Sequence, residues 1–456
     1  MRVDRSRLPG VGPDPDFTFP RIVRHPLSNG LDVRTVEHHT VPVLTFVLHV
    51  EGGLGADPTG LEGLAAITAD MVDEGTGALS AIDVAEALAA IGGEYDVDIG
   101  ADATVFTLTT LSRFAERGAE LLADILLRPS FRETDFDRVR RLRLDRLRQL
   151  KDLPSAVAER AFLCLMYGEH PYGHLAIGTE SALRSLGLEQ VAEFHARTFL
   201  PTRATLAIAG PMSHERLQAI AGEAFASWSA GAPLTEPRAA ADVEPVASPP
   251  RLAIVAREAA AQSELRMGHL SARRNTPDYP ALLVMNAVLG GQFVSRINLK
   301  LREEKGYTYG ARTGFDWRRG LSPFVLQASV HTAATADAIR DSLDEFAALG
   351  GSRPPSDAEI QLAKASLTRG YPRNFETAQQ VARSVTQLAL YDLPDTYFEE
   401  FTPKVNAVQP ADLVRAAQRY VDPMRTATLV VGDHLAIGDS LRSLGLGEPQ
   451  LLPADV

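Results

Sequence analysis

The first half of the chain contains four stretches in which β-branched and other apolar residues alternate or run together, and each stretch predicts a β-strand. They are residues 31–37, 43–50, 104–111 and 204–209. The segments between these strands predict helices. Residues of the kind that cap helix N-termini stand near the expected starts, namely Ser80, Ser112, Asp135 and Thr179.

The second half repeats this order of elements. Strands are expected at residues 251–256, 307–315 and 324–330, and helices at 279–289 and 294–304. Further helices are expected to begin at Ala334, Ser356, Ala378 and Ala411. Strand pairs with short connections, and helices clustered between them, indicate an α+β fold of mostly antiparallel sheets covered by helices.

One segment of the first half recurs in the second half. Residues 201–210 and 423–432 share proline, arginine and glycine at the same spacing, and each follows the pattern of an amphipathic helix. We therefore predict two homologous tandem domains, residues 1–230 and 251–456, that form a clam-like half-shell. Residues 231–250 between them are rich in proline and alanine, which is typical of a semi-extended linker.

Composition narrows the class of protein. The net charge of −12 at pH 7 argues against nonspecific nucleic-acid binding, and no apolar run is long enough to cross a membrane. The N-terminus lacks the apolar segment of a secretory signal, and Cys164 is the only cysteine. We therefore expect a cytoplasmic protein that has no intrachain disulfide and binds neither nucleic acid nor membrane.

A run rich in arginine covers residues 138–151. It is interpreted as a solvated or interface-facing helix, because a nucleic-acid patch would carry aromatic residues between its charges. The inward-facing residues of this helix are expected to be Leu142, Leu147 and Leu150.

Residues 63–76 predict a short apolar helix followed by a Gly-Thr turn. The segment resembles the zinc-binding helix of the pitrilysin and mitochondrial-processing-peptidase family, the inverse zincins, whose motif reads His-x-x-Glu-His. With the Gly-Thr pairs aligned, the two histidines fall on Ala66 and Asp70, and the glutamate general base falls on Ala69. Alanine offers no lone pair, so the resemblance implies that the helix is kept and the zinc site is lost.

In the family, a further zinc ligand is a glutamate on a later helix. Alignment on Asp152-Leu153-Pro154 places Arg146 at that position. A guanidinium would repel a dication, and a shift of one residue would bring Asp145, which still leaves at most two carboxylates and no imidazole. The sequence therefore predicts that this chain binds no zinc and holds no cofactor of its own.

Two histidine pairs have positions that suggest metal binding, and both are interpreted otherwise. His170 and His174 are four residues apart, but a proline and a glycine between them break the helix that would align their rings. His38 and His39 are neighbours at the end of a strand, so their side chains are expected on opposite faces.

Residues 290–309 carry the most specific resemblance to the family. There, a helix arginine and a tyrosine seven positions later reach the substrate, and here these residues are Arg302 and Tyr309. The resemblance implies that they hold substrate carbonyls and stabilise charge on the tetrahedral intermediate. The other interpretation makes Tyr309 a core aromatic, with Tyr307 on the same face, and Arg302 a solvated helix residue.

A lost zinc site beside a kept arginine–tyrosine pair resembles the metal-free subunit of the family's bacterial heterodimers. The resemblance implies a chain that is inactive alone, with zinc and the general base in a homologous partner that acts on peptides. Arg302 and Tyr309 would then act in trans on substrate bound to that partner.

Two other classes of function stay open from the sequence. The first is a non-catalytic structural or peptide-binding protein of the same fold. The second is a hydrolase of other chemistry, which the sequence disfavours because it has no Gly-x-Ser-x-Gly motif. Cys164 would be its candidate nucleophile, but it lies in a predicted apolar helix with no positive charge expected beside it.

Overall fold

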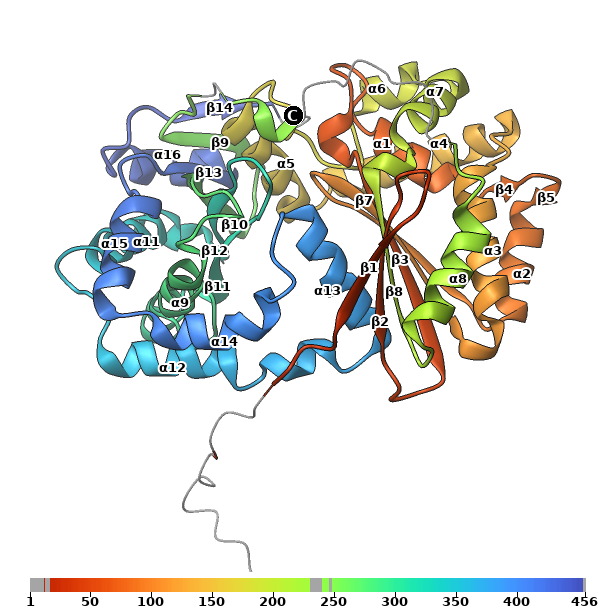
Figure 1. Cartoon of the computed structure of the whole chain (residues 1–456). Helices are drawn as coiled ribbons and strands as arrows, with labels where there is room; N and C mark the ends of the chain where they lie inside the picture. Colours follow the sequence, from red (N-terminus) through yellow and green to blue (C-terminus); the bar gives the residue numbers. More distant parts are fainter. Residues whose placement is uncertain (1–11, 13–16, 230–239, 246–247, 454–456) are drawn as a thin grey trace, which may run out of the picture.

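Two six-stranded sheets form the centres of two halves that lie side by side (Figure 1). The computed structural model describes residue 12 and residues 17–229, 240–245 and 248–453. In the first sheet the order is β1-β2-β8-β3-β7-β6; β2 and β8 are parallel, and the other neighbouring pairs are antiparallel. Its strands are β1 (Ile22–Pro26), β2 (Asp32–Glu37), β3 (Val43–Glu51), β6 (Glu94–Ile99), β7 (Ala103–Leu111) and β8 (Ala204–Gly210).

The second sheet has the order β11-β12-β10-β13-β9-β14, with β9 parallel to both β13 and β14. Five neighbouring strands occupy equivalent positions in the two sheets. Strands β9, β13, β10, β12 and β11 of the second sheet correspond to β2, β8, β3, β7 and β6 of the first, so β13 takes the place of β8. The echo between residues 201–210 and 423–432 therefore marks equivalent central strands, and the predicted pair of homologous α+β domains is confirmed. The strands are β9 (Leu252–Ala256), β10 (Gln262–Leu270), β11 (Thr308–Phe315), β12 (Pro323–His331), β13 (Ala427–Gly432) and β14 (Gln450–Leu452).

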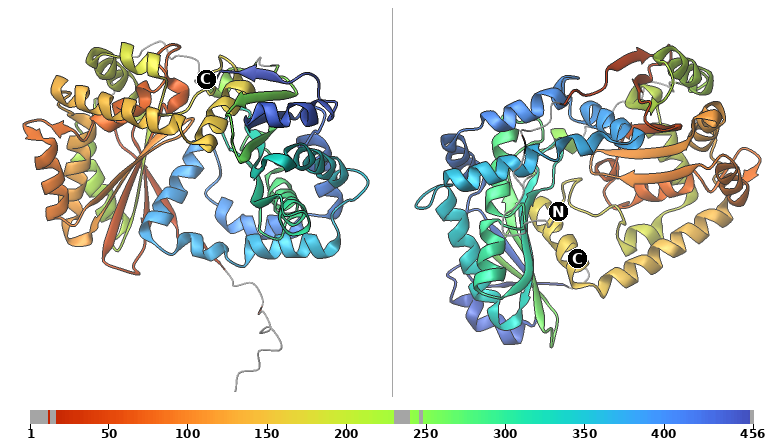
Figure 2. Two further views of the ribbon diagram at one scale, coloured as in Figure 1. Left: turned by 180° about the vertical axis from the view of Figure 1, so that it is seen from behind. Right: turned by 90° about the horizontal axis from the view of Figure 1, so that it is seen from below.

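Helices pack against each sheet (Figure 2). In the first half they are α1 (Leu64–Met71), α2 (Ala81–Ala90), α3 (Ala115–Leu127), α4 (Glu133–Lys151), α6 (Glu180–Ser185), α7 (Leu188–Thr198) and α8 (His214–Phe225), with a small hairpin of β4 (Gly75–Thr76) and β5 (Leu79–Ser80). In the second half they are α9 (Tyr279–Leu289), α10 (Arg296–Asn298), α11 (Thr335–Leu349), α12 (Asp357–Thr368), α14 (Tyr397–Ala407), α15 (Pro410–Tyr420) and α16 (His434–Arg442). Among the described helices, none has both the length and the apolar character of a membrane span.

The apolar alternation of the central strands explains the core. Phe46 and Leu48 of β3, together with Phe106 of β7, are fully buried with residues of α3 and α8. Burying a side chain of this size contributes about 2 kcal/mol to folding. One face of the first sheet is therefore fixed against helices of its own half.

The opposite face of each sheet is covered by a helix from the other half. Helix α5 (Pro154–Tyr167), from the first half, packs on β10 and β13, and helix α13 (Ala378–Leu390), from the second half, packs on β3 and β8 (Figure 1). In the second contact, Val381 and Val385 of α13 belong to the same buried cluster as Val47 of β3. The two halves thus exchange helices.

The turn between β11 and β12 makes a further contact between the halves. Arg318 is buried against the rings of Tyr167 and Tyr172, with its guanidinium carbon 4.8 and 4.9 Å from their centroids, and it donates to the Tyr172 carbonyl at 3.1 Å. The backbone N–H of Arg319 donates to the carboxylate of Asp102 at 2.9 Å, and the Tyr172 hydroxyl donates to the same carboxylate. The turn is therefore anchored in the first half by stacking and by hydrogen bonds.

Several predicted elements need correction. Strands β1, β4, β5, β6, β10, β13 and β14 were not expected as strands, although the repeat marked the segment of β13. The helix predicted at residues 294–304 is a short α10 followed by a π-helix, Leu299–Glu304. In α4, the inward residues are Phe136, Val139, Arg143 and Leu147, whereas Leu142 is exposed.

The predicted domain limits, residues 1–230 and 251–456, stay a prediction. Most of the predicted linker, residues 231–250, lies outside the described residues. Ala240 is within the described part, where it is buried in the same cluster as Tyr172.

Candidate functional site

The N-terminus of α1 is held by a carboxylate from outside the helix. Its cap residue is Gly63, which has a φ of 99° and no side chain to accept a hydrogen bond. Asp57, whose side chain is 1% exposed, accepts instead from the backbone N–H groups of Gly63 (2.7 Å) and Ala65 (2.6 Å), and it pairs with His174 at 2.9 Å. Two of the free N–H groups of this helix end are satisfied in this way.

Gly63 is required by space as well as by backbone conformation. A Cβ at this position would lie 2.9 Å from the Cα of Gly178, in the loop that follows His174. The helix that corresponds to the zinc helix is therefore placed closely against this loop.

At the positions aligned with the zinc motif, the side chains are two alanines and one aspartate that is already paired. Ala66 and Ala69 are buried and offer no donor atom. Asp70 forms an ion pair with Arg143 of α4, with the Nε–Oδ2 distance 2.7 Å, and the Arg143 side chain is only 10% exposed. The positive charge beside the Asp70 carboxylate is therefore the guanidinium of Arg143 and not a metal ion.

Arg146, which the sequence alignment placed at the third ligand position, is not the partner of Asp70. It hydrogen-bonds to the Gln149 side chain at 3.3 Å and lines the same cavity of 490 Å³ as Asp70 and Arg143. The sequence analysis missed Arg143. The sequence feature that could have identified Arg143 is its position: it is an arginine on the otherwise apolar inward face of α4, about one helical turn before Arg146.

These residues do not fit zinc. A catalytic zinc needs about three nitrogen, sulfur or oxygen ligands, and here one carboxylate remains that is already paired with a guanidinium. Within the described ranges, no three histidine, cysteine, aspartate or glutamate side chains are grouped so that they could hold a metal ion.

Another carboxylate that lines this cavity, Asp73, has no ion pair among the described residues. Asp73 follows α1 and lines the cavity together with Tyr95 of β6, whose hydroxyl is buried without a hydrogen-bond partner in the described structure. Burial, and after it the charge of Glu74, raises the pKa of Asp73 to about 6. Burial also raises the pKa of Tyr95, with Asp73 the largest charged contributor.

Asp73 is therefore expected to destabilise the fold at neutral pH. Its native pKa lies above the unfolded value, so the native state gains stability from protonation as the pH falls through about 6 and loses it as the pH rises. Asp73→Asn should stabilise the protein by roughly 1–3 kcal/mol at about pH 8, and this gain should vanish near pH 4. Urea unfolding at both pH values measures the difference.

A matched control is Asp344→Asn, which removes an exposed carboxylate on α11. It should change stability little at either pH. A gain at Asp73→Asn that is the same at both pH values would contradict the assignment of its cause to the buried charge.

The arginine and tyrosine singled out in the sequence lie at one open cavity of 410 Å³ on the second sheet. The guanidinium carbon of Arg302 lies 4.5 Å from the centroid of the Phe293 ring, and its Nε is 3.3 Å from a carboxylate oxygen of Glu303. Tyr309 is 86% exposed. The structure thus brings Arg302 and Tyr309 together, and the interpretation of Tyr309 as a core aromatic is wrong.

Tyr309 lies in an irregular stretch of β11, between the buried residues Thr308 and Ala311. The register of β11 on β12 shifts between Thr308 and Ala311. Thr308 bonds with its hydroxyl to the Ser329 carbonyl at 2.7 Å, and the Ala311 N–H donates to the Asn298 side chain at 3.0 Å. The two ends of the irregular stretch are therefore fixed, and Tyr309 between them points away from the core. Bulges next to functional sites often direct a side chain in this way.

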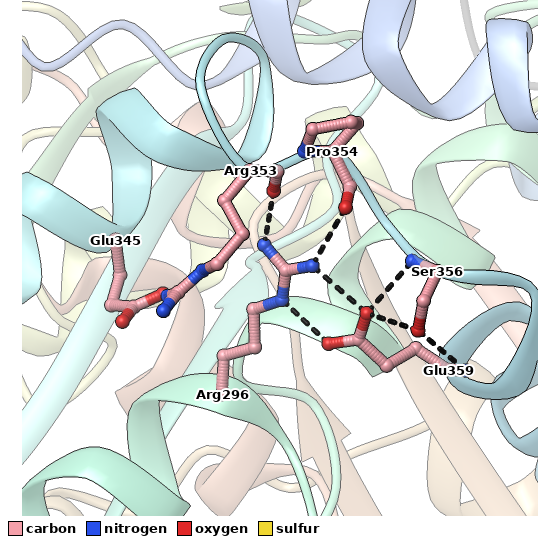
Figure 3. A network of polar contacts seen from close by, with 6 residues as sticks. All are labelled: Arg296, Glu345, Arg353, Pro354, Ser356 and Glu359. Carbon is pink, nitrogen blue, oxygen red and sulfur yellow. Dashed lines mark hydrogen bonds and ion pairs between the residues drawn. The ribbon is translucent and has the colours of Figure 1, made fainter.

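The helix that carries Arg302 is anchored at its start by a half-buried ion pair (Figure 3). The Nε and Nη2 atoms of Arg296 donate to the two carboxylate oxygens of Glu359 at 2.6 and 2.9 Å. The same guanidinium donates to the carbonyls of Arg353 and Pro354 at 2.6 and 3.0 Å. The bond from Arg296 lowers the pKa of Glu359 to about 2, so this clamp stays charged through the neutral range.

Neither histidine pair is arranged to bind a metal. His170 accepts from the Tyr172 N–H and meets the Val243 carbonyl at 2.9 Å, and His174 contacts Asp57. His38 is buried and His39 is exposed, as the strand alternation predicts.

Cys164 has a positive neighbour that the sequence analysis overlooked, since Arg160 lies one helical turn before it and lowers the pKa of the thiol. Burial outweighs this effect and raises the pKa of Cys164 overall. A thiol of this kind is a poor nucleophile.

Fold and site together define a peptidase-like protein of two homologous halves, with two alanines and a paired aspartate at the positions aligned with the zinc motif. Two family models match adjoining parts of the chain: residues 33–180 match insulinase (peptidase family M16), and residues 185–367 match the peptidase M16 inactive domain. The chain belongs to peptidase family M16, and the resemblance to the pitrilysin family is confirmed.

Similar proteins support this assignment. An uncharacterized zinc protease of Mycobacterium tuberculosis is 27% identical over 95% of this chain and 96% of its own length, and one of Streptomyces coelicolor is 24% identical over 90% and 89%. The crystal structure of a peptidase M16 inactive domain from Pseudomonas fluorescens has a TM-score of 0.84 at 23% identity and covers 90% of this chain and 98% of its own. A protease structure from Helicobacter pylori has a TM-score of 0.81 at 18% identity, with 91% and 100% covered. The two structures establish the fold.

Proposed function

We propose that this chain is the metal-free subunit of a heterodimeric zinc peptidase and is inactive alone. Its partner is a homologous chain that carries His-x-x-Glu-His and zinc, and its substrate is a peptide. The observation that carries the proposal is the contrast between two cavities. Arg302 and the exposed Tyr309 line one, whereas Ala69 and a paired Asp70 line the other, and a buried alanine, Ala66, stands at the remaining histidine position of the motif. A cytoplasmic location is part of the same proposal.

Within such a complex the zinc of the partner supplies the activated water. The residues of this chain act on the other side of the substrate. The exposed Tyr309 hydroxyl donates a hydrogen bond to the carbonyl oxygen as it gains negative charge, and the Arg302 guanidinium donates to a neighbouring backbone carbonyl. The Arg296–Glu359 clamp and the fixed ends of the irregular β11 stretch hold both groups in place before substrate arrives, which lowers the cost of reorganisation.

The proposal predicts a division of labour that can be measured. The purified chain should contain no stoichiometric zinc after dialysis and should not hydrolyse unstructured peptides. Mixing it with a zinc-bearing homologue from the same organism should restore hydrolysis, with the two chains in equal amounts. Elemental analysis, a peptide-cleavage assay and light scattering give the three readouts.

The controls are the partner alone and the partner with its motif glutamate replaced by glutamine. About one zinc per isolated chain, lost with peptidase activity on chelation, would contradict the metal-free assignment. Failure to associate with or activate any such homologue would favour the alternative, a non-catalytic structural or peptide-binding protein of this fold.

A further inference from the structure

The cavity at Arg302 and Tyr309 has a floor made by one face of the second sheet. Helix α5 packs on β10 and β13, while side chains of β10, β11 and β12 line the cavity beside it. The floor residues are Glu264 and Arg266 of β10, Arg312 of β11, and Gln327 and Ser329 of β12. This floor is polar, and the cavity has more guanidinium groups than carboxylates among its lining residues.

The single carboxylate among the lining residues is already engaged. Glu264 lies 3.2 Å from the Nη1 atom of Arg266, and the two side chains are 16% and 6% exposed. Arg266 also donates to the carbonyl of Ser155 in α5 at 3.2 Å, whereas its Nε has no hydrogen-bond partner among the described residues. Glu264 is therefore committed to the buried arginine beneath the cavity.

Two further guanidinium groups line the cavity without a buried carboxylate. Arg312 is exposed and donates to the side-chain oxygen of Gln327 at 2.8 and 3.2 Å. Arg302 has a charged partner in Glu303, but that carboxylate is half exposed and does not line the cavity. Three guanidinium groups thus face one carboxylate, in a protein whose net charge is −12.

We propose that this cavity selects peptides by a carboxylate, with Arg312 as the specificity-determining residue. The inference rests on the proposed function, because it places the peptide at Arg302 and Tyr309. A carboxylate can accept the free N–H groups of Arg312 in the paired geometry that guanidinium favours. The same guanidinium groups repel a lysine or arginine side chain of the peptide. The positive charge therefore strengthens the binding of acidic peptides and weakens the binding of basic ones.

Binding to this chain alone tests the inference without any zinc partner. Short peptides of glycine, alanine and leucine, acetylated and amidated at their ends, carry a central glutamate, glutamine or lysine and are titrated by calorimetry at low salt. The glutamate peptide should bind about five- to tenfold more tightly than the glutamine peptide, and the lysine peptide more weakly than both. A glutamine peptide with a free C-terminal carboxylate tells whether the cavity takes an internal side chain or the chain end.

Arg312→Gln should reduce the preference for glutamate over glutamine to about twofold or less, since it removes one of the two accessible charges. High salt should reduce it in the wild type as well. The matched control is Arg340→Gln, which removes an exposed arginine that pairs with Asp337 on α11 and does not line the cavity; its preference should equal that of the wild type.

Equal affinity for the glutamate and lysine peptides, an unchanged preference in Arg312→Gln, or no binding of any peptide at millimolar concentration would overturn the inference. These results are separable from failure of the proposed function. Selective binding without activation of a zinc-bearing homologue would leave the cavity assignment standing and remove the subunit role. Activation without selectivity would do the reverse.

Discussion

Replacing Tyr309 by phenylalanine in the proposed heterodimer is expected to lower turnover by about 10²–10³-fold. The substitution keeps the ring, which is 86% exposed and contributes little to the core, and deletes one hydroxyl. A donor aimed at a developing oxyanion acts mainly in the transition state, so kcat should fall with little change in KM or in the affinity between the subunits. Steady-state kinetics of the complex and a binding titration of the two chains measure the three quantities.

Tyr307→Phe is the matched control for this experiment. Tyr307 precedes Tyr309 by two residues, but its ring is partly buried against the core of the second half. Loss of its hydroxyl should leave turnover within about twofold of the wild type. If Tyr309→Phe retained full turnover, or if both variants lost it equally, the hydroxyl of Tyr309 would have no role in the chemistry.

The largest expected effect on stability belongs to Asp57→Ala. The substitution leaves the buried N–H groups of Gly63 and Ala65 without an acceptor and removes the partner of His174. Each buried unsatisfied donor costs about 1–3 kcal/mol, so the loss should reach about 3 kcal/mol or more. Urea unfolding gives the total, and hydrogen exchange of the amides in α1 shows whether the loss begins at that helix.

Asp57→Asn serves as the graded control. The amide keeps one acceptor oxygen, so it can satisfy one of the two N–H groups, and its cost should fall between that of alanine and the wild type. A loss below about 1 kcal/mol for Asp57→Ala would show that water replaces the carboxylate and that the cap is not structural.

The fold was predictable from the sequence where a fully buried strand produces a continuous run of apolar residues. Strands β8 and β13 are buried along their whole length, so they read as continuous apolar runs, and the repeat of one in the other shows the two halves. Strand β10 is equally central but was missed. It carries Glu264 and Arg266 on the face that lines a cavity, alternating with buried Leu265 and Met267. The strand therefore alternates and contains no β-branched residue, so it lacks the continuous apolar run that marks β8 and β13.

The candidate site was predictable only in part, for a related reason. Arg302 and Tyr309 share a short segment, so a resemblance in sequence locates both. The partner of Asp70 lies on a different helix, and sequence alignment cannot tell which turn of α4 faces α1. Arg143 rather than Arg146 meets Asp70 because it shares the inward stripe of Phe136, Val139 and Leu147.

The exchange of helices between the halves has a consequence for the order of events during biosynthesis. All strands of the first sheet have left the ribosome once Gly210 has emerged, yet Val47, Ala207 and Ala209 on its inner face are buried against α13, which ends at Leu390. The apolar inner face of the first sheet therefore stays uncovered while most of the second half is still being synthesised. The N-terminal half is then not a self-sufficient folding unit, and a fragment that stops short of α13 should be captured by chaperones or aggregate.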